Sequence, residues 1–172
     1  MKSLATQVAE YRHQHTTATN KLCHYIGIPA ILLGLLLLLN WVWVSFARHF
    51  NITFSWLFVI AILVYYYFID VKLAVVMTVV LIILNLICYW IAYPKPTTAN
   101  LILFLILFIG GWVLQFIGHS FEKAKPAFLN NIAQVLIAPL FVCAEFIQLS
   151  GLSKYFDFEE TSATKPADKN KH

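Results

Sequence analysis

The sequence predicts an all-α integral membrane protein: a helical bundle of four spans, with a fifth membrane-embedded helix and an N-terminal amphipathic helix. Of the 172 residues, 60% are apolar and only 12% are charged, about half the charged share of a soluble domain. Several runs approach or reach the roughly 20 apolar residues that a spanning helix needs, and they are apolar around the whole helix. This composition excludes a nucleic-acid-binding module and a disulfide-stapled secreted domain.

Four apolar runs predict the spans. They cover residues 25–44, 54–69, 73–92 and 100–118. The second run ends in three consecutive tyrosines at 65–67, an arrangement typical of side chains anchored at the membrane interface. The third run must end near residue 92, because Pro94 and Pro96 cannot continue a helix.

The fifth predicted helix, residues 131–149, carries polar side chains within an apolar run. Gln134, Glu145 and Gln148 fall on one helical stripe together with positions 138 and 141. A charged side chain facing lipid at the bilayer centre costs about 2.5–3.5 kcal/mol, so we expect Glu145 to face protein or water. The segment is long enough to span the membrane, but the sequence leaves open whether it does.

The two ends of the chain differ from the spans. Leu4, Val8, Tyr11 and His15 share one stripe and predict a short amphipathic helix at the membrane surface. The end of the chain is polar and mixed in charge, which is typical of disorder. We therefore expect one membrane domain over residues 1–153 and a disordered tail over 154–172.

The basic residues predict the orientation. If the N-terminus is cytoplasmic, six basic residues lie inside and two outside, which is the distribution that the positive-inside rule favours. The inside residues are Lys2, Arg12, Lys21, Lys72, Lys123 and Lys125, and the outside residues are Arg48 and Lys95. The very short loops, and a C-terminus without lysines at dilysine positions, favour a bacterial inner membrane.

Four crossings return the chain to the membrane face from which it started. Most of the residues with ligand or acid–base chemistry are therefore expected at one surface, whichever way the protein is inserted. They are His15, His24, Asp70, His119 and Glu122. His49 is expected on the opposite face.

The spacing of these residues adds detail. His15 and His24 are about half a turn out of phase, so they can meet only if the helix breaks between them. Residues 16–20 predict that break, with Asn20 as a capping residue. Gln115, His119 and Glu122 form one stripe at the end of the fourth span. Imidazoles with a carboxylate suit Fe, Zn or Mn, and spacing alone does not choose among these metals.

Two motifs in this sequence resemble a known family. The first is YRHQHTTATNKLCHYIGIP, which carries Tyr11, His15, Asn20 and His24, and the second is WVLQFIGHSFEKAKPAF, which begins at Trp112. Their combination, separated by hydrophobic spans, resembles the MPO family of membrane dioxygenases over about residues 4–150.

The resemblance implies an Fe(II)-dependent dioxygenase of fatty-acid α-oxidation, which shortens a 2-hydroxy fatty acid by one carbon with O2. The residues that it implies as iron ligands are His15, His24 and His119. Its catalytic candidates are Tyr11, Asn20 and Glu122, the last as a fourth ligand or as a carboxylate that orients an imidazole. Its candidates for binding the substrate are Lys21, Gln115 and Lys123. The expected partners are the 2-hydroxy fatty acid, O2 and the lipid bilayer, without nucleic acid.

Two other classes of function remain open from the sequence. A small transporter or proton-coupled carrier could use the polar stripe that holds Gln134 and Glu145. A non-catalytic membrane scaffold would need none of the histidines.

Overall fold

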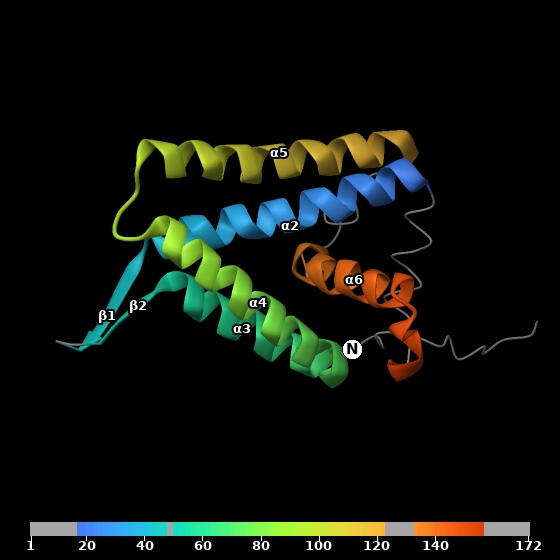
Figure 1. Ribbon diagram of the computed structural model, residues 1–172, viewed down its shortest axis with the longest axis horizontal. Helices are drawn as coiled ribbons and strands as arrows, with labels where there is room; N and C mark the ends of the chain where they lie inside the picture. Colours follow the sequence, from blue (N-terminus) through green and yellow to red (C-terminus); the bar gives the residue numbers. More distant parts are fainter. Residues whose placement is uncertain (1–16, 48–49, 123–132, 157–172) are drawn as a thin grey trace, which may run out of the picture.

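The computed structural model describes residues 17–47, 50–122 and 133–156 (Figure 1). Within these ranges the chain forms five α-helices, one two-stranded hairpin and a short 3-10 helix. In chain order they are α2 (Ala18–Asn40), β1 (Trp43–Ala47), β2 (Phe50–Thr53), α3 (Phe54–Ile69), α4 (Val71–Ala92), α5 (Thr98–Glu122), α6 (Ala133–Leu149) and η2 (Leu152–Tyr155). The amphipathic helix predicted before residue 16, and most of the predicted tail, lie outside the described residues.

Three of these helices are long and apolar enough to cross a membrane: α2, α4 and α5. The helix α3 has the predicted bounds, but its 16 residues give a length of only about 24 Å, less than the roughly 30 Å of a hydrocarbon core. The helix α6 is another shorter apolar helix. The predicted helical membrane bundle is therefore confirmed, but within the described residues three rather than four of its helices are long enough to cross a membrane.

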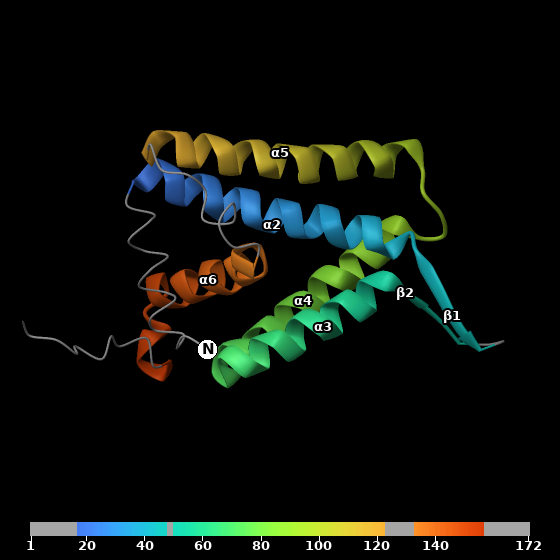
Figure 2. The same ribbon diagram turned by 180° about the vertical axis from the view of Figure 1, so that it is seen from behind.

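The helices from α2 to α5 run in alternating directions, and α2 and α5 lie side by side and antiparallel (Figures 1 and 2). Glycines allow their backbones to approach closely. A Cβ on Gly111 would lie 2.8 Å from the carbonyl oxygen of Gly27, and a Cβ on Gly34 would lie 3.0 Å from the backbone nitrogen of Phe108. Small residues are the usual means of tight packing between membrane helices.

The helices α3 and α4 form a hairpin that packs against the other side of α2, while α6 lies beside the N-terminal half of α2 (Figure 1). Asp70 separates α3 from α4, and its side chain accepts a hydrogen bond from the backbone nitrogen of Leu73 at 2.8 Å. Asp70 thus caps α4. The other end of α4 is at Ala92, directly before Tyr93 and Pro94, as the prolines predict.

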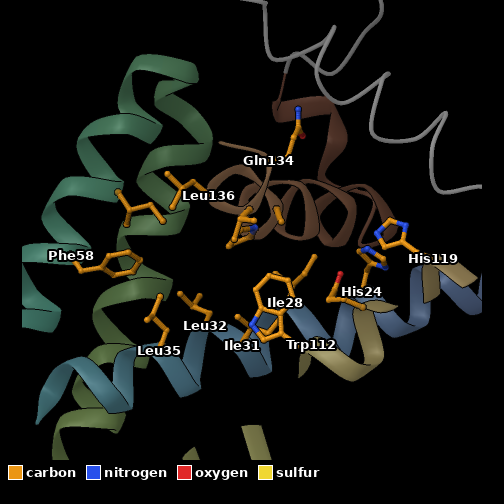
Figure 3. A pocket seen from close by; sticks show the side chains of 15 residues that line it. His24, Ile28, Ile31, Leu32, Leu35, Phe58, Trp112, His119, Gln134 and Leu136 are labelled. Carbon is orange, nitrogen blue, oxygen red and sulfur yellow. The ribbon is translucent and has the colours of Figure 1, made fainter. Parts of the chain in front are cut away.

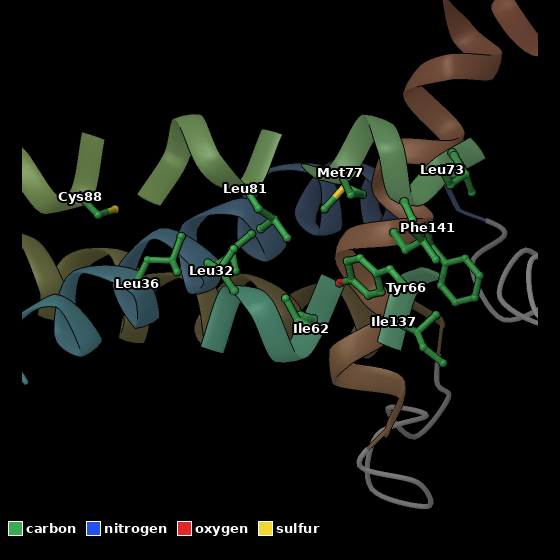
Figure 4. Close-up of a cluster of buried hydrophobic side chains, with 14 of the residues drawn as sticks. Leu32, Leu36, Ile62, Tyr66, Leu73, Met77, Leu81, Cys88, Ile137 and Phe141 are labelled. Carbon is green, nitrogen blue, oxygen red and sulfur yellow. The ribbon is translucent and has the colours of Figure 1, made fainter. Parts of the chain in front are cut away.

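Apolar side chains of α2, α3, α4 and α6 meet in one core (Figure 4). Tyr66 lies at its centre, is fully buried, and donates a hydrogen bond to the carbonyl oxygen of Leu136 on α6 at 2.6 Å. The prediction that the tyrosine run anchors the interface is therefore wrong for Tyr66, which instead joins α3 to α6. Its neighbour Tyr67 is exposed.

The first predicted span is wrong at both of its ends. The helix begins at Ala18 rather than at residue 25, and it ends at Asn40, so residues 43–44 belong to a strand instead. The strands β1 and β2 pair antiparallel and form a hairpin that was not predicted. Alternating β-branched and aromatic residues are a strand signal, but here they directly follow the apolar run and resemble a continuation of it.

A buried polar cluster lies where α2 meets this hairpin. Asn40 donates to the side-chain oxygen of Asn85 at 3.1 Å, and its own side-chain oxygen accepts hydrogen bonds from Thr53 and Ser55, both at 2.9 Å. All four residues are buried. We call Asn40, Thr53, Ser55 and Asn85 the hairpin-end cluster.

Candidate active site

The start of α2 is fixed by a threonine and by the end of α5. The Thr17 hydroxyl accepts a hydrogen bond from the backbone nitrogen of Asn20 at 3.3 Å. The capping residue of this helix is Thr17 rather than Asn20. The break predicted for residues 16–20 stays a prediction, because the residues before Thr17 lie outside the described part of the chain. Asn20 already belongs to the first turn of the helix, where its backbone is helical.

Glu122, the last residue of α5, reaches this helix start. Its Oε1 accepts hydrogen bonds from the backbone nitrogen of Thr17 at 3.0 Å and from the Thr17 hydroxyl at 3.3 Å. A carboxylate is stabilised by the partial positive charge at a helix N-terminus. Glu122 thereby holds the ends of α2 and α5 together, a contact between residues 105 positions apart in the sequence.

Two histidines meet between the same helices. The rings of His24 on α2 and His119 on α5 have centroids 4.8 Å apart and stand nearly perpendicular, at 88°. Both side chains are buried. The prediction that the histidine regions of the first and fourth spans converge is confirmed for this pair.

The backbone fixes the tautomer of His24. Its Nδ1 lies 2.9 Å from the carbonyl oxygen of Asn20, and because a carbonyl can only accept, Nδ1 carries the hydrogen. In the neutral ring the lone pair then resides on Nε2. Histidines that bind metals are commonly oriented in this way, with the second ring nitrogen donating to a carbonyl.

Two buried amide side chains flank the histidines. Asn20 is fully buried and Gln115 is 5% exposed. Neither atom of the Asn20 amide, nor Nε2 of Gln115, makes a hydrogen bond within the described part of the chain. A buried polar group without a partner costs about 1–3 kcal/mol, so these amides mark a place where a further group can supply the hydrogen bonds that the described residues do not.

A cavity of about 100 Å³ begins at the histidines and runs between α2, α3, α5 and α6 (Figure 3). His24, Gln115, His119 and Gln134 give it polar groups. Its other lining residues are apolar: Ile28, Ile31, Leu32, Leu35, Phe58, Ile62, Trp112, Val135, Leu136, Ala138 and Pro139. Such a mostly apolar cavity with a few convergent polar groups is typical of a small-molecule site.

The structure brings together five of the predicted site residues: Asn20, His24, Gln115, His119 and Glu122. Tyr11, His15 and Lys123 lie outside the described residues. Lys21 is half-buried on α2 and does not line the cavity.

Within the described residues, no three His, Cys, Asp or Glu side chains are grouped so that they could hold a metal ion. Of the three histidines predicted as iron ligands, His24 and His119 lie together and His15 lies outside the described residues, so the iron site stays a prediction.

Three further polar residues singled out from the sequence differ in whether they line the cavity. Asp70 caps α4 and does not line the cavity. Glu145 is buried, as expected from the free-energy cost of exposing a charged side chain to lipid. Gln134 lines the cavity, but Glu145 does not, so the polar stripe of α6 does not form one continuous path in this cavity.

Sequence reasoning missed Thr17 and Phe58. Thr17 carried a signal, since threonine is a favoured capping residue ahead of an apolar helix. Phe58 carried none, because it stands in an evenly apolar helix and only the angle at which α3 packs directs it to the cavity.

The sequence is similar to known proteins over most of its length. The profile of the Mpo1-like family, described as 2-hydroxy-palmitic acid dioxygenase Mpo1-like, matches residues 1–149. The 2-hydroxy-palmitic acid dioxygenase MPO1 of Saccharomyces cerevisiae is 32% identical over 146 residues, which cover 84% of this chain and 79% of the yeast protein. No solved structure matches the chain. With both histidines of the buried pair inside the matched range, the chain belongs to the Mpo1-like family.

Proposed function

We propose that this protein is a membrane dioxygenase that shortens 2-hydroxy fatty acids by one carbon, with Fe(II) as cofactor and O2 as co-substrate. The activity for which the yeast relative is named supports the class of reaction and substrate. The observation that carries the proposal is the buried pair of His24 and His119 at the polar end of an otherwise apolar cavity.

The residues present fit an iron ion in their chemistry. His24 has its Nδ1 committed to a carbonyl, so Nε2 is the nitrogen that would bind the metal, and His119 lies in ring contact with it. Neutral imidazoles suit iron. His15 is proposed as the third ligand on the resemblance of its motif. Bound Fe(II) would supply the redox chemistry with O2 that no side chain of the chain provides.

The overall reaction defines what the remaining residues must do. A 2-hydroxy acid and one O2 give the acid that is one carbon shorter, one CO2 and one water. The substrate carboxylate and hydroxyl must therefore be held at the histidines. The amide of Gln115, which lines the cavity, can donate a hydrogen bond to these oxygens, and the apolar walls exclude bulk water from the reacting carbons. Asn20 is not among the lining residues, and its buried amide is proposed to donate from one helical turn before His24.

Glu122 is proposed as a positioning residue for the same site. Its contact with Thr17 fixes where α2 begins. This contact thereby also fixes the positions of Asn20 and His24 relative to the residues of α5. Lys21 and Lys123 are proposed to attract the substrate carboxylate from the membrane surface. The distribution of basic residues supports a cytoplasmic N-terminus, and we propose a bacterial inner membrane as the location.

The test is product analysis with purified full-length protein in lipid nanodiscs. Wild type, supplied with Fe(II), O2 and 2-hydroxypalmitate, should yield the one-carbon-shorter acid and CO2. His24→Ala and His119→Ala should each lower turnover at least about 100-fold, since losing even an outer partner of a metal ligand costs about 10–100-fold. Both should also bind less iron after anaerobic reconstitution. His49→Ala, expected on the opposite face, is the matched control.

Wild-type protein that binds iron no better than the two histidine variants, and gives no shortened acid, would refute the proposal. The transporter alternative makes the opposite prediction. It requires that Glu145→Gln abolish flux in liposomes while the histidine variants keep it.

A further inference from the structure

The cavity has two ends of different chemical character (Figure 3). His24, His119 and Gln115 form one end, where imidazole and amide groups gather. Phe58 and Leu35 lie at the opposite end, which is built from apolar side chains. A ligand that fills this cavity must therefore combine a polar head with an apolar tail.

One face of α2 forms the floor between these ends. His24, Ile28 and Leu35 follow helical spacing, with Ile31 and Leu32 on the same side, and all five line the cavity. At 1.5 Å per residue, His24 and Leu35 are about 16 Å apart along the helix axis. The floor is therefore elongated along α2, which suits an extended acyl chain.

The polar end carries an independent sign of a ligand. Gln115 is 5% exposed, lines the cavity, and its Nε2 makes no hydrogen bond within the described part of the chain. An amide N–H donor in this position suits an oxygen acceptor, such as the carboxylate or hydroxyl of a 2-hydroxy acid. Phe58 and Leu35 at the opposite end offer no such group, and the remaining polar lining residue, Gln134, comes from the first turn of α6.

We propose that this cavity holds the acyl chain of the substrate, with its head at His24 and His119, and that Phe58 closes the far end and so limits the chain length accepted. This inference rests on the function proposed above and adds to it the residue that sets the substrate range. Phe58 comes from α3 and is partly buried against the core. Its ring stands across the cavity from the histidines (Figure 3), where the terminal carbons of a long chain would arrive.

The experiment measures turnover of saturated 2-hydroxy acids of increasing length, in nanodiscs, by wild type and variants. Phe58→Ala should move the preferred substrate to longer chains. Its kcat/KM for an acid two carbons longer than the wild-type optimum should rise about 100-fold relative to that optimum, because each methylene in an apolar pocket is worth about 10-fold or more. Phe58→Trp should move the preference to shorter chains.

Phe68→Ala is the matched control, because it removes the same ring from the same helix at a position that is 76% exposed. Its length profile should equal that of wild type. Leu35→Ala provides a second enlargement of the far end from another helix, so that the inference stays testable if Phe58→Ala does not fold.

A readout without turnover separates this inference from the proposed function. A 2-hydroxy acid with a photoreactive diazirine at its terminal carbon should label the peptide that contains Phe58. Labelling there, with a length profile that shifts as described, supports the inference.

Active enzyme whose profile is unchanged in Phe58→Ala and Leu35→Ala overturns the length limit while leaving the function intact. Labelling confined to lipid-facing residues overturns the placement of the chain. Wild type that shortens no acid overturns the proposed function, whatever the labelling shows.

Discussion

The two ends of the bundle both bury polar side chains, but the side chains of one end are joined to one another by hydrogen bonds, whereas an amide of the other end has no such bond within the described residues. In the hairpin-end cluster, Asn40 donates to Asn85 and accepts from Thr53 and Ser55. At the histidine end, the Asn20 amide and Nε2 of Gln115 make no hydrogen bond within the described ranges, although both side chains are buried. Nδ2 of Asn85 in the hairpin-end cluster also makes no hydrogen bond within the described ranges. Buried polar groups are normally satisfied. We therefore infer that the hairpin-end cluster, whose four side chains are joined by hydrogen bonds, serves stability, and that the histidine end, whose Asn20 amide has none, serves a ligand.

Replacement of Asn40 by leucine should have the largest effect on stability. The change removes the acceptor of Thr53 and Ser55 and the donor to Asn85, and leaving buried polar groups unpaired costs about 2–3 kcal/mol. We expect a clearly lower unfolding temperature in detergent. Asn51→Leu, at an exposed position of β2, is the control and should melt like wild type. Equal melting of both variants would show that the hairpin-end cluster is not structural.

The glycine contact between α2 and α5 should have the next largest effect. A Cβ on Gly111 would meet the Ile31 side chain at 2.7 Å and the Gly27 carbonyl oxygen at 2.8 Å, so Gly111→Ala should destabilise by about 1–3 kcal/mol. A Cβ on the adjacent Gly110 would meet no atom within 4 Å among the described residues. Gly110→Ala should therefore be neutral or stabilising by up to about 1 kcal/mol. Thermal melting of the two variants side by side tests this contrast.

Asn20→Leu should have the smallest effect on stability and a distinct effect on activity. The wild-type amide has no partner to lose within the described ranges, so we expect the free energy of unfolding to change by no more than about 1 kcal/mol. Turnover of 2-hydroxypalmitate should fall at least about tenfold, which is the effect of losing a hydrogen bond to a charged group. Melting and turnover are measured on the same preparation. A loss of stability as large as that of Asn40→Leu would contradict the distinction between the two ends.

Much of the bundle could be predicted because helix signals in this chain are local. The prolines after Ala92 end α4, and the apolar run over 54–69 gives α3 with the bounds observed. The hairpin could not be separated from the first span, since Trp43 and Val44 are as apolar as the helix before them. Its strands depend on pairing with residues 50–53, which local patterning does not report.

In the candidate site, too, local sequence patterns predicted some features, while others depend on how the helices pack. Parity of the crossings predicted that His24 and His119 lie at one membrane surface, and helical spacing placed His119 on one stripe with Gln115 and Glu122. The roles of Thr17 and Phe58 depend on how the helices pack, because helix ends and crossing angles decide which side chains line a cavity. Sequence spacing on one helix cannot supply that information.

The contact of Thr17 with Glu122 has a consequence for how the protein is made. The two residues bracket the helices α2 to α5 in the sequence, and the paired histidines lie just inside them on the first and last of the three long helices. A chain is synthesised from its N-terminus, and its early parts wait for the later ones. The histidine pair is therefore completed only when α5 has been inserted, so a nascent or truncated chain lacks the site.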